Sequence, residues 1–523
     1  MQRASRIQSG TYRDSVSLMQ LSEKLSQREG IERAFVAMGT AANKRVLEEV
    51  GMLTEELRGA GSNDLMMVAE SDSHQQAEEA LGAAVDQLRS SAANPSSSPQ
   101  GSDDKPTTLR GAAAKLPEAN LLLLSVPGPF AALEAAKALH LGLHVFLFSD
   151  NVSLREELEL KRLAVSRGLL LMGPGCGTAI INGVALAFAN VVRRGSVGIV
   201  GASGTGLQEV TTLIDRGGGG ISQAIGVGGR DLSREIGGLM MLQGIEMLGA
   251  DPATEVIVLI SKPPEPTVAQ AVLKAAVATG KKVIVNFLGE SQTGRTGGAL
   301  LTDTLEDTAT AALAEVVEGA IAPLSPPTED LEATAEEQRL LLAPGQRFIR
   351  GLFSGGSLCD EAMEILARKL SAVHSNIPLD PSWALEDIGQ SHEHSCLDMG
   401  EEDFTQGRPH PMIDLRWRAR RLLQEAADPQ VAVILLDVVL GHGSSEDPAG
   451  GLEAAIAQGR QQARNEGRHL VVIAHVCGTE RDPQDLEDQE ARLRQAGALT
   501  LSTNAGASRL ALSIVSGDSH ANL

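Results

Sequence analysis

Residues 196–206 of the chain, SVGIVGASGTG, join a short apolar run to a glycine-rich turn. The apolar part, 196–200, predicts a buried strand, and the turn at 201–206 leads into an amphipathic helical pattern. A strand, a glycine turn and a helix start in this order indicate a doubly wound α/β sheet. The first amide groups of such a helix have no intrahelical partners and carry the positive end of its dipole. The turn therefore also predicts an anion site, with a plain tight connection between strand and helix as the structural alternative.

A second turn of the same kind stands at 354–357, Ser-Gly-Gly-Ser, between an apolar run at 348–353 and another helical pattern. In open α/β sheets, ligands bind outside the carboxyl ends of the strands, so both turns lie where binding is expected. We therefore predict phosphate binding by backbone amides and hydroxyl groups of both turns, with helix capping as the alternative. The predicted residues are Ser203, Gly204, Thr205, Gly355, Gly356 and Ser357.

Apolar runs alternate with helical patterns along most of the chain, which is typical of several α/β domains. Two stretches rich in Pro, Ser, Asp or Glu interrupt this alternation and indicate linkers. The predicted organisation is a small α/β domain at 1–92, a flexible linker at 93–117, domains at 118–192 and 193–320, a linker at 321–346 and a domain at 347–523.

Composition excludes several classes of protein. A net charge of −22 and 2% aromatic residues argue against a nucleic-acid-binding protein. The four cysteines form no CxxC pair, so we predict neither a disulfide framework nor a metal site. No signal peptide and no run of about 18 apolar residues is found, so we expect a cytoplasmic protein that acts on small molecules and binds no membrane.

Three motifs carry a resemblance to the α subunit of succinyl-CoA synthetase over about 118–320. They are MGPGCG at 172–177, VGIVGASGTG at 197–206 and GVGGRD at 226–231. The C-terminal part, with HSCLDMG at 394–400 and CGTERDP at 477–483, is similar to the carboxyl-terminal ligase domain of the β subunit of that enzyme. The resemblance implies a Rossmann-like domain of the CoA-binding type at 118–192. It also implies two flavodoxin-like domains of the ligase type at 193–320 and 347–523.

Four further motifs resemble the FdrA family of acyl-CoA-synthetase-like proteins along the whole chain. They are DSVSLM at 14–19, FSDNVS at 148–153, GGRDLS at 228–233 and GRPHPMID at 407–414. FdrA-type proteins are associated with oxamate carbamoyltransferase. The resemblance therefore implies a subunit of a carbamoyltransferase that interconverts a ureido acid and phosphate with carbamoyl phosphate and an amide acid.

The chain also departs from the synthetase pattern. Synthetases relay phosphate through a histidine, and the corresponding segment GRTGGA at 294–299 has Thr296 at that position. The segment between 320 and 347 is too short for an ATP-grasp domain. No counterpart of the glycine-rich CoA loop is evident, which makes CoA a doubtful ligand and leaves phosphate or carbamoyl phosphate as the expected one.

Two alternatives to the carbamoyltransferase stay open. One is an NDP-forming acyl-CoA synthetase, or succinyl-CoA ligase-like protein, whose ATP-grasp domain is on a partner. The other is a non-catalytic scaffold that senses phosphate or a nucleotide. Because synthetase modules assemble, we expect a homo-oligomer together with hetero-subunits.

The remaining candidate residues follow from the motifs. For Cys176 the alternative is a small buried thiol, and for Arg230 with Asp231 it is a salt-bridged loop. His392 and His394 offer no third metal ligand at a predictable spacing, so an exposed loop is the better interpretation. We predict Cys176, Arg230, Arg408 and His410 as catalytic residues, Gly228 and Gly229 as phosphate-binding residues, and Asp231, Asp437 and His442 as further site candidates.

Overall fold

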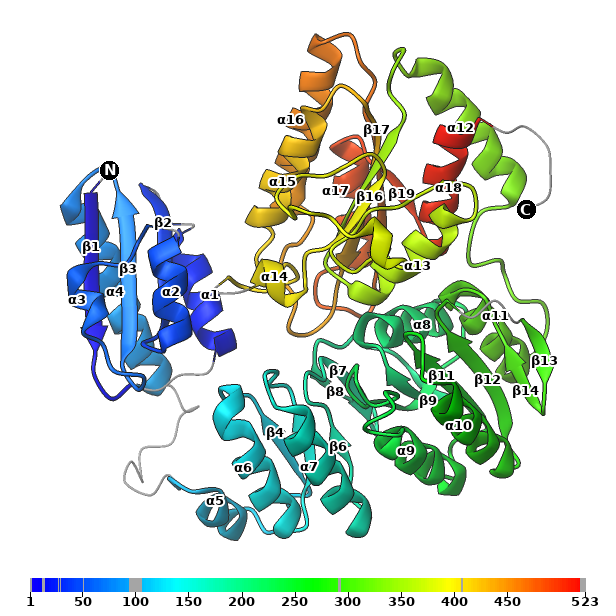
Figure 1. Cartoon of the computed structure of the whole chain (residues 1–523), viewed down its shortest axis with the longest axis horizontal. Helices are drawn as coiled ribbons and strands as arrows, with labels where there is room; N and C mark the ends of the chain where they lie inside the picture. The colour runs from blue at the N-terminus through cyan, green and yellow to red at the C-terminus, as the bar shows by residue number, and fades with distance from the viewer. Residues whose placement is uncertain are drawn as a thin grey trace. The chain divides into compact units, whose positions relative to one another are not determined.

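The computed structural model describes residues 2–11, 15–26, 28, 30–49, 51–93, 106–289, 293–405 and 408–517. These residues form two compact units (Figure 1). The first comprises Met1–Glu118 and Glu402–Asp414, and the second comprises Ala119–Glu401 and Leu415–Leu523. Among the described residues, no helix is long and apolar enough to cross a membrane.

The first unit is a small α/β domain with a three-stranded antiparallel sheet in the order β1-β3-β2. Leu18, Leu21, Leu65 and Met67 belong to its buried core. The polar strand β1 has no apolar run in the sequence, which is why the sequence did not predict it. The elements are β1 (Gln2–Gln8), α1 (Ser15–Ser26), β2 (Ile31–Met38), α2 (Ala41–Glu49), α3 (Glu55–Arg58), β3 (Leu65–Ser71), α4 (His74–Ala93), α5 (Leu109–Lys115) and α14 (Glu402–Thr405).

The second unit begins with a Rossmann-like module, a parallel sheet in the order β4-β5-β6. Its elements are β4 (Leu121–Leu124), α6 (Gly128–His140), β5 (His144–Leu147), α7 (Leu154–Ser166) and β6 (Leu171–Met172). In the segment predicted as a linker, 93–117, residues 94–105 lie outside the described residues and 109–115 form α5.

The central module is an eight-stranded sheet in the order β13-β14-β12-β11-β9-β10-β7-β8. Its five parallel strands have the flavodoxin-like order, with β9 between β10 and β11. Helices α8 and α11 cover one face, and α9 and α10 cover the other (Figure 1). The elements are β7 (Thr178–Ile181), β8 (Val184–Ala187), β9 (Arg194–Ala202), α8 (Gly204–Arg216), β10 (Ile221–Gly226), α9 (Leu239–Ala250), β11 (Val256–Ser261), α10 (Pro266–Ala278), β12 (Lys282–Phe287), β13 (Gly294–Thr296), β14 (Ala299–Leu301) and α11 (Leu305–Val316).

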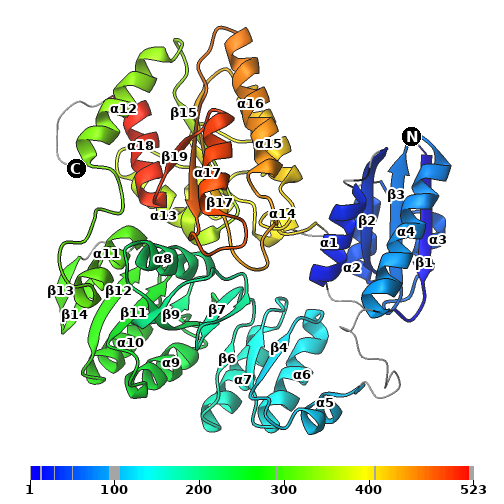
Figure 2. The same ribbon diagram turned by 180° about the vertical axis from the view of Figure 1, so that it is seen from behind.

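The C-terminal module repeats this order in a five-stranded parallel sheet, β16-β15-β17-β18-β19. Helices α13 and α18 pack on one face, and α15 and α17 pack on the other (Figure 2). The elements are α12 (Thr328–Leu341), β15 (Phe348–Phe353), α13 (Gly356–Ala367), the 3₁₀ helix η1 (Pro381–Trp383), β16 (Ser395–Asp398), α15 (Arg416–Ala426), β17 (Val431–Val439), α16 (Gly450–Asn465), β18 (Val471–Cys477), α17 (Leu486–Gln495), β19 (Leu499–Leu501) and α18 (Asn504–Ser516).

The α/β class with its small N-terminal domain and flavodoxin-like sheets agrees with the prediction from the sequence. Two details differ. Strand β7 pairs antiparallel with β10, so the predicted boundary at 192/193 falls inside one sheet. The predicted linker at 321–346 contains α12, which packs along α18 through an apolar side that includes the buried Leu331 and Ala335.

A buried ion pair connects the central and C-terminal modules. Glu209 on α8 and His475 on β18 approach to 2.7 Å, and both side chains are almost fully buried. The other ring nitrogen of His475 lies 3.1 Å from the carbonyl oxygen of Leu501. A neutral imidazole can donate through only one nitrogen, so this geometry fits the protonated ring. Burial opposes both charges, but Glu209 holds the pKa of His475 above its ordinary value, and His475 lowers the pKa of Glu209.

We predict that Glu209→Ala destabilises the protein by about 3–5 kcal/mol, because it leaves a buried imidazole without its counter-charge. Chemical unfolding followed by circular dichroism measures this change. Glu159→Ala is the matched control, because its ion pair with Arg155 lies at the surface and contributes little. Equal unfolding midpoints for the two variants would contradict the prediction.

Candidate functional site

The two glycine-rich turns meet in the structure. Ser203 follows β9 and Gly355 follows β15, the first parallel strands of their modules, so both turns stand at the topological switch points of the sheets. The hydroxyl oxygens of Ser203 and Ser357 lie 2.6 Å apart. The amide of Ser357 donates to the hydroxyl oxygen of Thr205 at 3.3 Å. The N-termini of α8 and α13 therefore face each other, and we call this meeting point the cradle.

Glycine is required in the cradle by close packing. A Cβ atom on Gly355 would lie 2.7 Å from Cγ2 of Thr205, and one on Gly206 would lie 2.2 Å from the hydroxyl oxygen of Ser203. Neither Ser203 nor Gly355, the N-cap residues of the two helices, caps its helix with a side-chain hydrogen bond. Two positive helix ends that meet without a side-chain cap from their own N-cap residues favour negative charge nearby.

Asp437 holds the second turn in place. Its carboxylate accepts hydrogen bonds from the amides of Ser354 and Gly355, each at 2.8 Å, and from the hydroxyl of Ser354 at 3.0 Å. The buried Arg418 donates to the same carboxylate at 2.8 Å. Asp437, in the neighbouring strand β17, thus fixes the backbone of the second turn.

Three charged residues beside the cradle were missed by the sequence analysis as site residues. Lys262 follows β11, and its ammonium nitrogen lies 3.0 Å from a carboxylate oxygen of Asp360 on α13. Asp398 ends β16, and a Cβ atom on Gly356 would lie 2.4 Å from one of its carboxylate oxygens and 3.5 Å from the nitrogen of Lys262. The available signal was position, because Lys262 and Asp398 both stand at carboxyl ends of parallel strands.

Burial and mutual charge set the ionisation of this group. Burial raises the pKa of Asp398 to about 7, although Lys262 opposes the shift. Burial also raises the pKa of Asp360. For Lys262 burial disfavours the charge, but Asp360 and Asp398 raise its pKa above the ordinary value. Asp398 therefore titrates near neutral pH beside the cradle.

Cys176 and Gly228 lie at the neighbouring strand end. Gly226, the last residue of β10, pairs with Gly201 of β9, and a Cβ atom on Gly226 would lie 2.6 Å from the sulfur of Cys176. Gly228 has φ +84° and packs against the carbonyl of Pro174, which excludes a side chain there. Burial raises the pKa of Cys176 to about 12, so its sulfur is a neutral thiol at neutral pH.

Arg230 and Asp231 belong to an ionic network that is buried except at the exposed Arg230, and a salt-bridged loop was the structural alternative in the sequence analysis. Arg230 pairs with Glu157 at 2.8 Å, and Asp231 pairs with the fully buried Lys161 at 2.8 Å. Asp231 also accepts from the amide of Met241 at 2.8 Å, at the start of α9. These contacts join α7 to the turn after β10 and leave a catalytic role for Arg230 without support.

The other predicted residues lie elsewhere. His442 is exposed, and its backbone pairs with Ala189, next to Asn190, whose side chain donates to Asp482 at 2.8 Å. Arg408 and His410 belong to the first compact unit, where the amide of Asp414 donates to the carbonyl of His410 at 3.0 Å. The catalytic role of Arg408 and His410 stays a prediction, and so does phosphate binding by Gly229.

Thr296 is remote from the cradle. It pairs with Ala299, which pairs with Val283 near the start of β12, whereas Ser203 and Lys262 follow the ends of β9 and β11. Along the strands, the pairing position of Thr296 and the position of the cradle are five residues apart, which is about 16 Å at about 3.3 Å per residue. The residue at the position that corresponds to the relay histidine is thus a threonine, and it lies far from the cradle.

Two groups of side chains within the described residues have metal-ligand chemistry. Glu209, His475 and Cys477 are buried. The hydrogen-bonded ion pair of Glu209 and His475, at 2.7 Å, leaves no room for an ion between these two side chains. His374, His392 and Glu393 are more exposed, with ligand atoms within 4.8 Å of one another. In the structure, His392 is thus grouped with His374 and Glu393, and not with His394, with which the sequence paired it.

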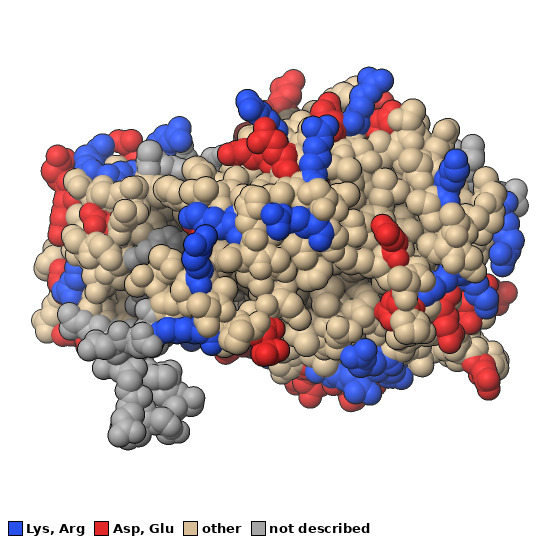
Figure 3. Space-filling model, turned by 90° about the horizontal axis from the view of Figure 1, so that it is seen from below, with Lys and Arg blue, Asp and Glu red and all other residues tan. Residues whose placement is uncertain are grey.

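A cavity of 280 Å³ lies beside α13, on the side of the central module. Its charged lining residues are Asp303, Glu361, Glu364 and Arg368, and Arg368 pairs with Asp303 at 2.6 Å. Burial raises the pKa of Glu361 to about 7. The excess of carboxyl groups makes this cavity unsuited to an anionic ligand. On the face drawn in Figure 3, the described basic and acidic side chains are interspersed among many neutral ones.

Comparison with known proteins places these features in a family. The chain matches a CoA-ligase model at 352–514, a CoA binding domain model at 192–289 and a model described as AllF, heavy metal-associated domain, at 1–106. Uncharacterized protein YahF of Escherichia coli (strain K12) is 48% identical over 504 residues, which cover 96% of this chain and 96% of YahF.

Ligase subunits match part of the chain. Subunit alpha of the ADP-forming succinate–CoA ligase of Aquifex aeolicus (strain VF5) is 32% identical over 29% of this chain and 50% of that protein. SauD, a subunit of the ADP-forming sulfoacetate-CoA ligase of Bilophila wadsworthia (strain 3_1_6), is 29% identical over 33% of this chain and 59% of that protein. The chain thus spans little more than half the length of these subunits.

Solved structures align at low similarity. The apo acetyl-coenzyme A synthetase 1 of Ca. Korarchaeum cryptofilum covers 76% of this chain and 82% of its own, with 17% identity and a TM-score of 0.30. A TM-score this low carries no argument about function.

The heavy metal-associated description does not fit the residues of the first unit. All four cysteines of the chain lie beyond residue 106, and the only histidine up to that position is His74. Its Nδ1 is engaged with the carbonyl oxygen of Arg3 at 2.8 Å. Soft metal ions prefer thiolate ligands, which this domain lacks.

We predict that native protein resists alkylation at Cys176, because its thiol is buried and un-ionised. Iodoacetamide labelling followed by mass spectrometry measures the reaction, and urea-unfolded protein serves as the positive control. Rapid native labelling of Cys176 would restore it as a candidate nucleophile.

We also predict that the free energy of unfolding falls as the pH rises from about 5 to about 8. The folded pKa of Asp398 is raised to about 7, so folded protein holds a proton that the unfolded chain has lost, and this stabilisation disappears as the pH passes through the folded value. Asp398→Asn should flatten the profile and gain on the order of 1 kcal/mol relative to wild type at high pH. Urea unfolding at both pH values tests this, and parallel profiles would contradict it.

Proposed function

The chain belongs to the FdrA family of acyl-CoA-synthetase-like proteins, and on that premise we propose that it is the phosphate-handling subunit of an acyl-CoA synthetase-like enzyme. In this proposal, the cradle holds the phosphate group of an acyl phosphate. The acceptor attacks the acyl carbon, the bond from that carbon to the phosphate oxygen breaks, and phosphate leaves with the electron pair. An acceptor thiol, as in CoA, gives a thioester, and its proton passes to solvent.

The observation that carries the proposal is the meeting of two helix N-termini across the 2.6 Å contact of Ser203 and Ser357. Each helix contributes a positive dipole end and amide donors directed to the same place. Hydroxyl groups of Ser203, Thr205 and Ser357 can exchange their contacts with one another for contacts with phosphate oxygens. Charge that develops on the leaving phosphate would be stabilised there.

A partner is part of the proposal. The matched ligase relatives are named as subunits, and this chain has no segment with the length of an ATP-grasp domain between its central and C-terminal modules. We therefore assign any ATP-dependent step to a separate subunit.

A second candidate is transfer of a carbamoyl group to an amide acid such as oxamate, which one observation favours. Thr296 lies at the opposite end of the sheet from the cradle and is not a histidine, so a reaction without a phosphohistidine suits this chain. Carbamoyl phosphate is itself an acyl phosphate, and the same cradle would hold it. Ligase names among the relatives make the synthetase-like reaction our first proposal.

We expect the purified chain to bind inorganic phosphate and acetyl phosphate, and Ser203→Ala to weaken both by about 10-fold or more, because a hydrogen bond to a charged group is lost. Ser203→Asp should abolish binding by charge repulsion. Isothermal titration calorimetry measures the affinities, and Ser166→Ala, an exposed serine on α7, is the control. Binding that is absent, or unaffected by Ser203→Asp, would refute the site.

Turnover by the chain with its co-purified subunits separates the two acceptors. Acetyl phosphate with CoA should yield acetyl-CoA if the first proposal holds. Carbamoyl phosphate with oxamate should yield oxalurate if the second holds, and that result without thioester formation would replace the first proposal.

A further inference from the structure

One positive side chain stands between the cradle and a buried group of carboxyls. Lys262 is about one-third exposed, whereas Asp360 and Asp398 are buried behind it. The ammonium nitrogen of Lys262 lies 3.0 Å from Asp360 and close to the first residue of α13, Gly356. Lys262 can thus be reached from solvent and from the cradle, but its partner carboxyls cannot.

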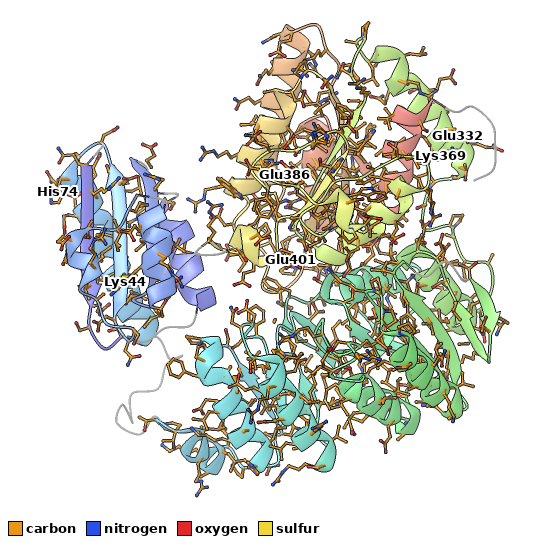
Figure 4. All side chains as sticks on the ribbon, viewed as in Figure 1. Lys44, His74, Glu332, Lys369, Glu386 and Glu401 are labelled. Carbon is orange, nitrogen blue, oxygen red and sulfur yellow. The ribbon has the colours of Figure 1, made fainter. Side chains whose placement is uncertain are left out.

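The charges around Lys262 are unbalanced in the free protein. Asp360 on α13, Asp398 at the end of β16 and Glu401 just after it all act on the one ammonium group. The Cys359 thiol also faces this group but is un-ionised, because burial raises its pKa. Figure 4 shows Glu401 at the edge of the C-terminal module. Carboxylates in this number would repel an anion unless one of them is neutralised.

Resting on the proposed function, we propose that Lys262 is the residue that pairs with the bound phosphate, and that a carboxyl of Asp398 or Asp360 takes up a proton when Lys262 turns to the ligand. No covalent bond changes in this step. The proton comes from solvent and neutralises the carboxylate that Lys262 leaves. Anion binding and proton uptake are therefore linked at one site.

Asp398 is the carboxyl best placed to take the proton. Its backbone is fixed on both sides by Asn376, which accepts from the amide of Asp398 at 3.0 Å and donates to its carbonyl at 2.9 Å. The carboxylate cannot follow Lys262, because it also accepts from the amide of Gly400 at 2.9 Å. Burial already raises the pKa of Asp398 to about 7, and Lys262 lowers it, so withdrawal of the ammonium would raise it further.

Calorimetric titration of the full chain with acetyl phosphate tests this proposal. The phosphate group of acetyl phosphate is already ionised near neutral pH, so a proton that is taken up on binding is taken up by the protein. Titration in buffers of different ionisation enthalpy, at about pH 7.5, should show a net uptake approaching one proton. Lys262→Met should weaken binding by about 10-fold or more and remove the uptake. Asp398→Asn should retain binding, at wild-type strength or tighter, while the uptake falls.

Two further variants make the test specific. Lys369→Met removes an exposed lysine beyond the C-terminal end of α13, labelled in Figure 4, and should change neither affinity nor proton uptake. Lys262→Arg keeps the charge and should keep binding within about threefold. Retained binding by Lys262→Arg, together with a circular dichroism spectrum of Lys262→Met that matches wild type, would show that a loss in Lys262→Met is not a folding defect.

The outcomes separate this inference from the proposed function. Binding of acetyl phosphate by wild type with no proton uptake, or equal binding by Lys262→Met, overturns the inference and leaves the cradle intact. No binding by wild type overturns both.

Discussion

Two helices point their positive ends at each other in this protein, and much of the second unit is arranged around that contact. Like dipole ends repel, so the 2.6 Å approach of Ser203 and Ser357 needs support from elsewhere. Part of it comes from nearby negative charge, the carboxylates of Asp437 and Asp360 beside the start of α13. The remaining positive potential is the basis on which we propose the cradle as an anion site.

Contacts between the modules keep the two helix ends in register. Glu209 on α8 pairs with His475 on β18 and also accepts from the amide of Asn504, at the start of α18, at 3.2 Å. Asp482 accepts from the side chain of Asn190 at 2.8 Å. All these groups are buried or nearly so, and buried polar contacts are costly to break. The cradle is therefore rigid in its backbone, and adjustment on binding is left to side chains such as Lys262.

The sequence predicted what is local. A strand, a glycine turn and a helix share one short segment, so both halves of the cradle could be predicted from 196–206 and 348–357. The flavodoxin-like class of the two sheets was implied only by the resemblance to succinyl-CoA synthetase. Lys262 and Asp398 stand at carboxyl ends of parallel strands, which was a signal in the sequence. Their approach to the cradle could not be predicted, because it depends on the strand order and on the packing of one module on the other. The sequence pattern was misleading at Arg230 and Asp231, because their loop resembles an anion-binding turn. In the structure their side chains form ion pairs with Glu157 and Lys161.

The placement of Thr296 limits how phosphate can reach the cradle. A phosphohistidine works only if its loop moves the phosphoryl group between two sites, and the hairpin of β13 and β14 is fixed by pairing at the far end of the sheet. In the reaction that we propose, the phosphate group therefore arrives on a diffusing molecule, as inorganic phosphate or an acyl phosphate. A diffusing anion needs a counter-charge that solvent can reach, which the buried carboxyls cannot supply and the helix ends supply only in part. Lys262 is partly exposed beside the cradle and meets that requirement. The threonine at the relay position and this lysine are therefore both consistent with a site for a diffusing phosphate group.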